Sequence, residues 1–119
     1  MRITTPKAGD CVDVTHDWKV CWEHVDTDPR TFSLWLTHLT SEPAEEVELL
    51  ATVNTFDSNC VTVPGRQLPI RGGDRYRVWA TAVGETNPCC PYSESADFRA
   101  LVGTACPPEV AEEMDQSQL

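Results

Sequence analysis

Several features that would assign a protein class at once are missing from this sequence. The 119 residues contain no run of about 18 apolar residues, the length that a membrane-spanning helix needs. No Asn-x-Ser/Thr sequon is present, so N-linked glycans are not expected. The Gly-x-Ser-x-Gly, His-Glu-x-x-His and phosphate-loop patterns are absent as well. The commonest signatures of serine hydrolases, zinc proteases and nucleotide-binding enzymes are therefore lacking.

Basic residues are also scarce. Nine Lys and Arg stand against 19 Asp and Glu, which gives a formal net charge of −10. Such a chain repels phosphate backbones and anionic lipids, so neither nucleic acid nor a membrane surface is an expected partner. The hydrophobic fraction of 40% is ordinary for a globular chain of one domain. We expect that domain over residues 1–106, followed by an acidic C-terminal tail over residues 107–119.

Cysteine, by contrast, is abundant, with six residues in a short chain. This density is typical of a disulfide framework, and disulfides persist in oxidising compartments. We therefore expect a secreted protein in which Met1 is a start codon added after a removed leader. The adjacent Cys89 and Cys90 have the wrong spacing for a zinc site, so neither a metal nor a cofactor is predicted.

Short runs of alternating apolar and polar residues predict β-strands, each with one buried face. The predicted strands cover residues 2–6 and 11–14 (two halves of one strand), 18–22, 32–37, 47–53, 59–63, 74–83 and 98–102. About seven strands with turn signals every 8–12 residues are typical of an immunoglobulin- or fibronectin-III-like antiparallel sandwich of two sheets. A closed barrel is the alternative, but the long loops at 41–46 and 84–93 favour the sandwich.

Several short pieces resemble one known family in their order and spacing. They are Ile3-Thr4-Thr5-Pro6, Trp22, Asp28-Pro29, Phe32 to Leu36, Val61 to Pro64, Tyr76 to Ala80, Tyr92-Ser93 and Phe98. Together they resemble the domain of fungal Ser/Thr-rich, GPI-anchored cell-wall proteins of the killer-toxin-resistance and Knh type. The resemblance implies a secreted, fungal, non-enzymatic sandwich of seven strands. The six cysteines and the acidic C-terminal residues depart from that family and favour a soluble relative.

One disulfide follows from the alternation. If Trp18 faces the core, Cys21 faces outward, and the same reasoning places Val61 inward and Cys60 outward. The two strands are neighbours in the predicted topology, so we expect an exposed cross-strand Cys21–Cys60 bridge. Such a bridge differs from the antibody-type disulfide, which crosses the core.

The other four cysteines leave the pairing open. The second half of the first strand is expected beside the last strand, which takes Cys11 to the Cys89-Cys90 loop. The remaining member of that pair would then bind Cys106. Six cysteines allow 15 pairings in principle, so this second assignment is a hypothesis.

Two tryptophans define the candidate binding face. With Phe32 and Tyr76 inward, Trp35 and Trp79 point outward from adjacent strands, and Arg75 and Arg77 flank Trp79. A pair of exposed indoles with arginine at the edge suits a sugar ring or a partner protein. The alternative is that the C-terminal tail or the Cys89-Cys90 loop covers both rings as a minor core.

The remaining candidates carry weaker signals. No nucleophile partner is recognisable for any histidine of the chain, namely His16, His24 and His38. One loop combines His24 with Glu23, Asp26 and Asp28, which could hold a calcium ion. Local turn hydrogen bonds of the two aspartates are the simpler interpretation.

These observations predict a non-enzymatic, secreted module of the fungal cell wall. Its expected partner is cell-wall glucan or another polysaccharide, bound through Trp35 and Trp79. The alternative is a secreted effector or protein-interaction module that acts on a host or surface protein or forms a homodimer. A small glycan hydrolase would need two carboxylates across a cleft, which the sequence does not indicate.

Overall fold

A computed structural model describes residues 1–38, 46–84 and 90–106. The described residues form nine strands and no helix. The strands are β1 (Arg2–Thr5), β2 (Cys11–Asp13), β3 (Trp18–Glu23), β4 (Thr31–His38), β5 (Glu46–Asn54), β6 (Cys60–Val63), β7 (Gly73–Thr81), β8 (Ser93–Glu94) and β9 (Phe98–Leu101). Within these ranges there is no helix long and apolar enough to cross a membrane. The predicted tail, residues 107–119, lies outside the described residues.

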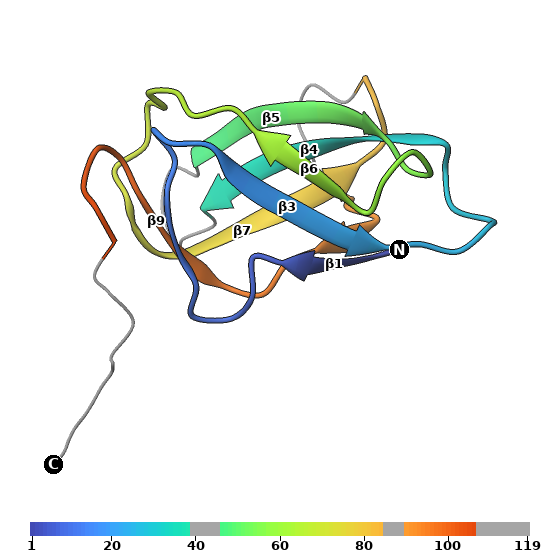
Figure 1. Ribbon diagram of the computed structural model, residues 1–119, viewed down its shortest axis with the longest axis horizontal. Coiled ribbons are helices and arrows are strands. Elements are labelled where there is room, and N and C mark those ends of the chain that lie inside the picture. The colour runs from blue at the N-terminus through green and yellow to red at the C-terminus, as the bar shows by residue number, and fades with distance from the viewer. Residues whose placement is uncertain (39–45, 85–89, 107–119) are drawn as a thin grey trace, which may run out of the picture.

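The strands form two sheets that lie face to face (Figure 1). One sheet has the order β1-β3-β6, and the other has the order β2-β9-β7-β4-β5 with β8 paired to β7. The pairing is antiparallel except between β2 and β9, which run parallel. The predicted immunoglobulin-like sandwich is confirmed, and the two separate sheets rule out the closed barrel.

The first predicted strand divides between the two sheets. Its first half, β1, pairs with β3, while its second half, β2, pairs with β9. Gly9 lies in the connection with a φ of +81°, a conformation that glycine adopts without a steric cost. The N-terminal segment therefore contacts both sheets and holds them together.

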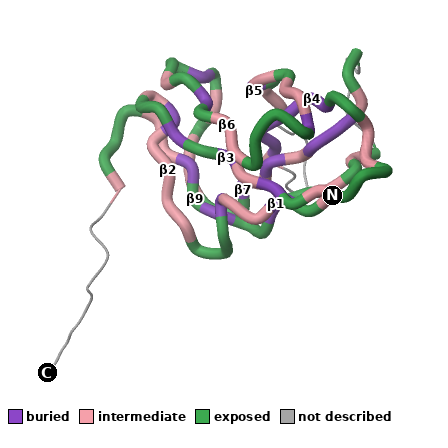
Figure 2. Tube along the Cα trace, turned by 45° about the vertical axis from the view of Figure 1, so that its right-hand side comes forward, coloured by how far each residue is buried: buried purple, intermediate pink, exposed green. Residues whose placement is uncertain are grey.

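The core lies between the sheets and follows the predicted alternation. The inward positions of β3, β4 and β7 are buried, and they are Trp18, Val20, Trp22, Phe32, Leu34, Leu36, Tyr76, Val78 and Ala80. Trp22 meets Phe32 edge to face across the two sheets, with ring centroids 5.1 Å apart. Figure 2 shows these buried segments in the central strands, with exposed segments mainly in the connections.

The Cys21–Cys60 bridge is confirmed. The two residues are direct partners in the β3–β6 ladder, with Cα atoms 4.0 Å apart. Both side chains are half-buried, which fits an outward position on a sheet whose other face forms the core. The bridge therefore joins neighbouring strands of one sheet and does not cross the core.

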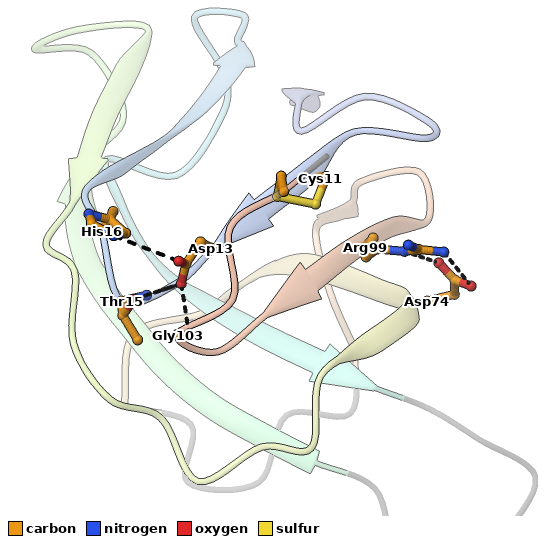
Figure 3. Close-up of a disulfide and its surroundings, with 8 residues drawn as sticks. Cys11, Asp13, Thr15, His16, Asp74, Arg99 and Gly103 are labelled. Atoms are coloured by element: carbon orange, nitrogen blue, oxygen red, sulfur yellow. Dashed lines mark hydrogen bonds and ion pairs between the residues drawn. A yellow bond between two sulfur atoms is a disulfide. The ribbon is translucent and has the colours of Figure 1, made fainter. Parts of the chain in front are cut away.

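The second assignment was wrong, because Cys11 bonds Cys106 (Figure 3). β2 does lie beside the last strand, as predicted, with Cys11 opposite Arg99. Beyond β9 the chain turns at Gly103, whose amide donates to the Asp13 carboxylate at 3.1 Å. This turn brings Cys106 back to β2. Cys90 is also disulfide-bonded, whereas Cys89 lies outside the described residues.

Candidate functional site

The outer face of the β4–β7 pair carries the predicted tryptophans. Trp35 lies opposite Trp79 in the antiparallel register, so the two residues are side by side as predicted. Trp35 does not belong to the core cluster between the sheets, which agrees with its outward parity. The alternation of β4 and β7 thus gave the correct face for both indoles.

The prediction of two open indole rings was wrong for Trp35. Its side chain is only 8% exposed, and its Nε1 donates a hydrogen bond to Thr81 Oγ1 at 2.9 Å. Trp79 is half-buried, and its Nε1 is covered without a hydrogen-bond partner in the described part of the chain. Trp35 therefore has a packing role, and only Trp79 retains ring surface for a ligand. The alternative expected the Cys89-Cys90 loop or the C-terminal tail to cover the rings. Residues 85–89 of that loop and residues 107–119 of the tail lie outside the described residues.

A pocket of about 260 Å³ lies on the same sheet, and its lining includes both predicted arginines. Thr37, Arg75, Arg77 and Asp97 line it. Thr37 lies two residues beyond Trp35 on the outer face of β4, and its Oγ1 donates to the Arg77 carbonyl at 3.2 Å. Alternation alone would have found Thr37. Asp97 has no such sequence signal, because it lies in the connection before β9.

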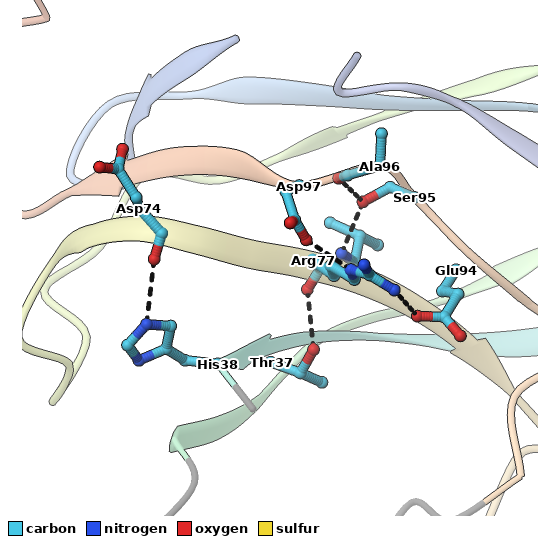
Figure 4. A network of polar contacts seen from close by, with 9 residues as sticks. Thr37, His38, Asp74, Arg77, Glu94, Ser95, Ala96 and Asp97 are labelled. Carbon is cyan, nitrogen blue, oxygen red and sulfur yellow. Dashed lines mark hydrogen bonds and ion pairs between the residues drawn. The ribbon is translucent and has the colours of Figure 1, made fainter. Parts of the chain in front are cut away.

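Arg77 is held in place by two carboxylates (Figure 4). Its Nε donates to Asp97 at 2.5 Å, and its Nη1 donates to Glu94 at 2.6 Å. These bonds, led by the one to Asp97, raise the pKa of the Arg77 guanidinium above its ordinary value. Arg77 therefore ties β7 both to β8 and to the connection between β8 and β9, and it fixes the wall of the pocket.

Arg75 is in a different situation. Its side chain is exposed and forms no hydrogen bond or ion pair with the described residues. Its φ of +69° makes it the one non-glycine with a positive φ in the described ranges. The neighbouring Asp74 is bound instead to Arg99, with Oδ1 and Nε 2.8 Å apart, and this lowers the Asp74 pKa.

The calcium interpretation of the 23–28 loop receives no support. Asp28 Oδ2 accepts a hydrogen bond from the Val25 amide at 2.8 Å, which is the predicted local turn bond. The described residues contain no group of three or more potential metal ligands.

His24 packs edge to face on Phe56, with ring centroids 5.0 Å apart. It also borders a hollow of about 290 Å³, which Arg2, Glu23 and Val25 line as well.

The other two histidines have structural contacts. His38 stacks on Tyr76, with ring centroids 4.1 Å apart, and its Nε2 lies 3.0 Å from the Asp74 carbonyl (Figure 4). His16 lies 3.7 Å from Asp13 at an exposed turn. Neither ring faces a serine or cysteine nucleophile in these contacts.

Comparison with known families identifies the chain. The model of the Kre9/KNH-like N-terminal Ig-like domain matches residues 5–95, which is most of the sequence. The chain belongs to this family. No curated protein and no solved structure matches it. The Kre9/KNH family is fungal and is linked to cell-wall glucan synthesis, and this agrees with the resemblance found in the sequence.

Proposed function

We propose that this Kre9/KNH-like domain is a secreted, non-enzymatic cell-wall module that binds a polysaccharide at the Arg75–Arg77 pocket and on Trp79. The observation that carries the proposal is the pocket, where guanidinium, carboxylate and hydroxyl groups lie together. Trp79, whose indole is partly exposed, follows Arg77 by two residues on β7. Placed polar groups beside an apolar surface are typical of small-molecule sites. A sugar ring would offer hydroxyl groups to the polar groups of the pocket and an apolar face to the Trp79 indole.

The charges around the pocket favour a neutral polysaccharide. Arg77 is balanced by Glu94 and Asp97 together, which leaves one surplus negative charge that Arg75 offsets. The whole chain carries −10, so an acidic polymer would be repelled on approach. Cell-wall glucan has no charge, so the net charge of the chain does not repel it and the balanced charges of the pocket suit it. Binding is therefore expected to change little between low and moderate salt, because few ions are displaced.

Retention on insoluble glucan and on chitin tests the proposal. Trp79→Ala should reduce retention on the preferred polymer about tenfold, because it removes the apolar surface beside the pocket. Phe56→Ala is the matched control, since Phe56 is another aromatic, 41% exposed, and follows Asn54 at the opposite end of the sheet from Thr37. Equal retention of the Trp79 variant and the wild type, or no retention on any polymer, would reject the proposal.

The absence of catalysis is part of the same proposal. Asp97, which lines the pocket, and Glu94 are both bound to Arg77, so they are not placed as an acid and a base across an open cleft. Incubation with a panel of soluble glycans should release no new reducing ends. Turnover that persists in a repurified sample and disappears with Asp97→Asn would assign a hydrolase instead.

A protein-interaction module is the second candidate. Phe56 is 41% exposed and packs on His24, and Val25, the residue after His24, is 59% exposed. Exposed apolar side chains are a feature of protein contacts. Sedimentation over a range of concentrations tests self-association, and a monomer throughout would count against a homodimer.

A further inference from the structure

We propose that Arg75 is the specificity-determining residue of the pocket, and that its unfavourable backbone conformation is retained because it presents the guanidinium to a neutral glycan. This inference rests on the proposed polysaccharide binding. It adds which side chain makes the decisive contact, and it predicts that stability and binding change in opposite directions at this position.

The backbone at Arg75 is the first support. A φ of +69° places this residue in the left-handed region, which a side chain with a Cβ rarely adopts. The two residues before Asp74 also have positive φ values, +80° for Gly72 and +133° for Gly73, but both are glycines. Between Gly73 and Tyr76 the register with β9 shifts, so Arg75 lies in a bulge of β7. A glycine would fit all of this geometry, yet the sequence places arginine there.

The side chain is the second support. Arg77 and Arg99 both hold carboxylates at 2.5–2.8 Å, whereas Arg75 forms no hydrogen bond or ion pair within the described ranges. Its visible contribution to the fold is a charge attraction to Asp74, which lowers the pKa of that carboxylate less than Arg99 does, and this is little to offset the unfavourable φ. Strained residues without a structural role are concentrated at functional sites. Arg75 also lines the pocket, so its free donors face the space where a ligand would lie.

The ligand chemistry follows from the pocket. The Arg75 guanidinium offers planar N–H donors, which suit two neighbouring oxygens of a sugar. Asp97 supplies a carboxylate oxygen that accepts from hydroxyl groups. At about 260 Å³ the pocket is smaller than most small-molecule sites. It therefore fits a short part of an uncharged glycan chain, and the long remainder would extend over Trp79.

Two substitutions separate the backbone effect from the contact. Arg75→Gly removes both the unfavourable φ and the side chain. It should raise the melting temperature by about 2–4 °C and reduce retention on neutral glucan about tenfold. Arg75→Lys keeps the positive charge and the same φ demand but loses the planar fork of donors. It should leave the melting temperature within about 1 °C and reduce retention severalfold.

The other possible results of these experiments would each contradict one part of the proposal. If Arg75→Gly binds glucan like the wild type, Arg75 is not the contact, although the proposed function stands. If Arg75→Gly melts at a lower temperature than the wild type, the Arg75 side chain stabilises the bulge. The left-handed backbone of Arg75 is then not an unfavourable conformation that is kept for binding. Stronger retention on an acidic polymer, lost with added salt, would overturn the neutral ligand. A wild-type chain that no polymer retains would reject the proposed function and this contact with it.

Discussion

Replacing Gly65 with alanine is expected to destabilise the fold because this glycine lies against another backbone segment. A Cβ at this position would lie 2.5 Å from the Thr15 carbonyl oxygen and 2.6 Å from the Cα of His16. Both contacts are with main-chain atoms, so no change of side-chain rotamer relieves them. The φ of Gly65 is outside the left-handed region, and the effect of the substitution is therefore steric alone.

The size of the effect follows from the bonds that hold the two segments together. The Gly65 amide donates to Asp17 Oδ1 at 2.8 Å, and the Arg66 amide donates to the Val14 carbonyl at 3.0 Å. Moving the segments apart by roughly 1 Å to admit the methyl group weakens both bonds, at about 0.5–1.5 kcal/mol each. Overpacking adds about 1–3 kcal/mol. We expect a total near 3 kcal/mol, which lowers the melting temperature by about 10 °C in a domain of this length.

Thermal unfolding followed by tryptophan fluorescence measures this effect. Gly9→Ala is the matched control, because Gly9 has a φ of +81° and no atom within 4 Å of the position that the added methyl group would take. It should cost only the left-handed strain of about 1 kcal/mol. Asp17→Ala removes one hydrogen bond without adding bulk and should also cost about 1 kcal/mol. If Gly65→Ala melts no lower than either control, the close approach of Thr15 and His16 to Gly65 is wrong.

Three further predictions concern the disulfides, the acid limit and Trp35. Replacing Cys21 and Cys60 together with serine should cost about 4 kcal/mol for the 39-residue separation, measured by denaturant unfolding; peptide mapping that shows another partner for either cysteine would contradict the fold. The pKa of Asp13 is lowered below 3.8 by hydrogen bonds from Thr15 and Gly103, so its stabilising effect is present above pH 3.8 and lost as the pH falls through the folded-state value. Asp13→Asn should flatten the fall in melting temperature below that pH, and an unchanged slope would exclude this carboxylate. Trp35→Phe should cost about 1–2 kcal/mol through the bond to Thr81 without changing glucan retention, and a loss of retention would place Trp35 in the binding surface.

The sequence predicted the faces of the strands well, because alternation depends only on the backbone of each strand. Cys21 and Cys60 were paired correctly since both lie on the outward parity of neighbouring strands. Trp35 and Trp79 were placed side by side for the same reason. The exposure of Trp35 was not predictable in this way, because parity states which way a side chain points and not what covers it.

Features that depend on distant backbone segments were missed. The partner of Cys11 is decided by the turn at Gly103 and by the hydrogen bond from that turn to Asp13, 90 residues earlier in the chain. Asp97 reaches the pocket through its bond to Arg77 from an irregular connection, for which the sequence has no periodic signal. The left-handed conformation of Arg75 was equally hidden, since arginine is not a residue that indicates such a backbone.

The Cys11–Cys106 bond has a mechanical consequence. It encloses a separation of 95 residues, so a pulling force applied outside the two cysteines passes through a single covalent link and bypasses every strand from β2 to β9. While the bond is oxidised, tension could detach only β1, which precedes Cys11. Only after reduction could stretching peel the other strands apart and lengthen the chain by up to roughly 300 Å.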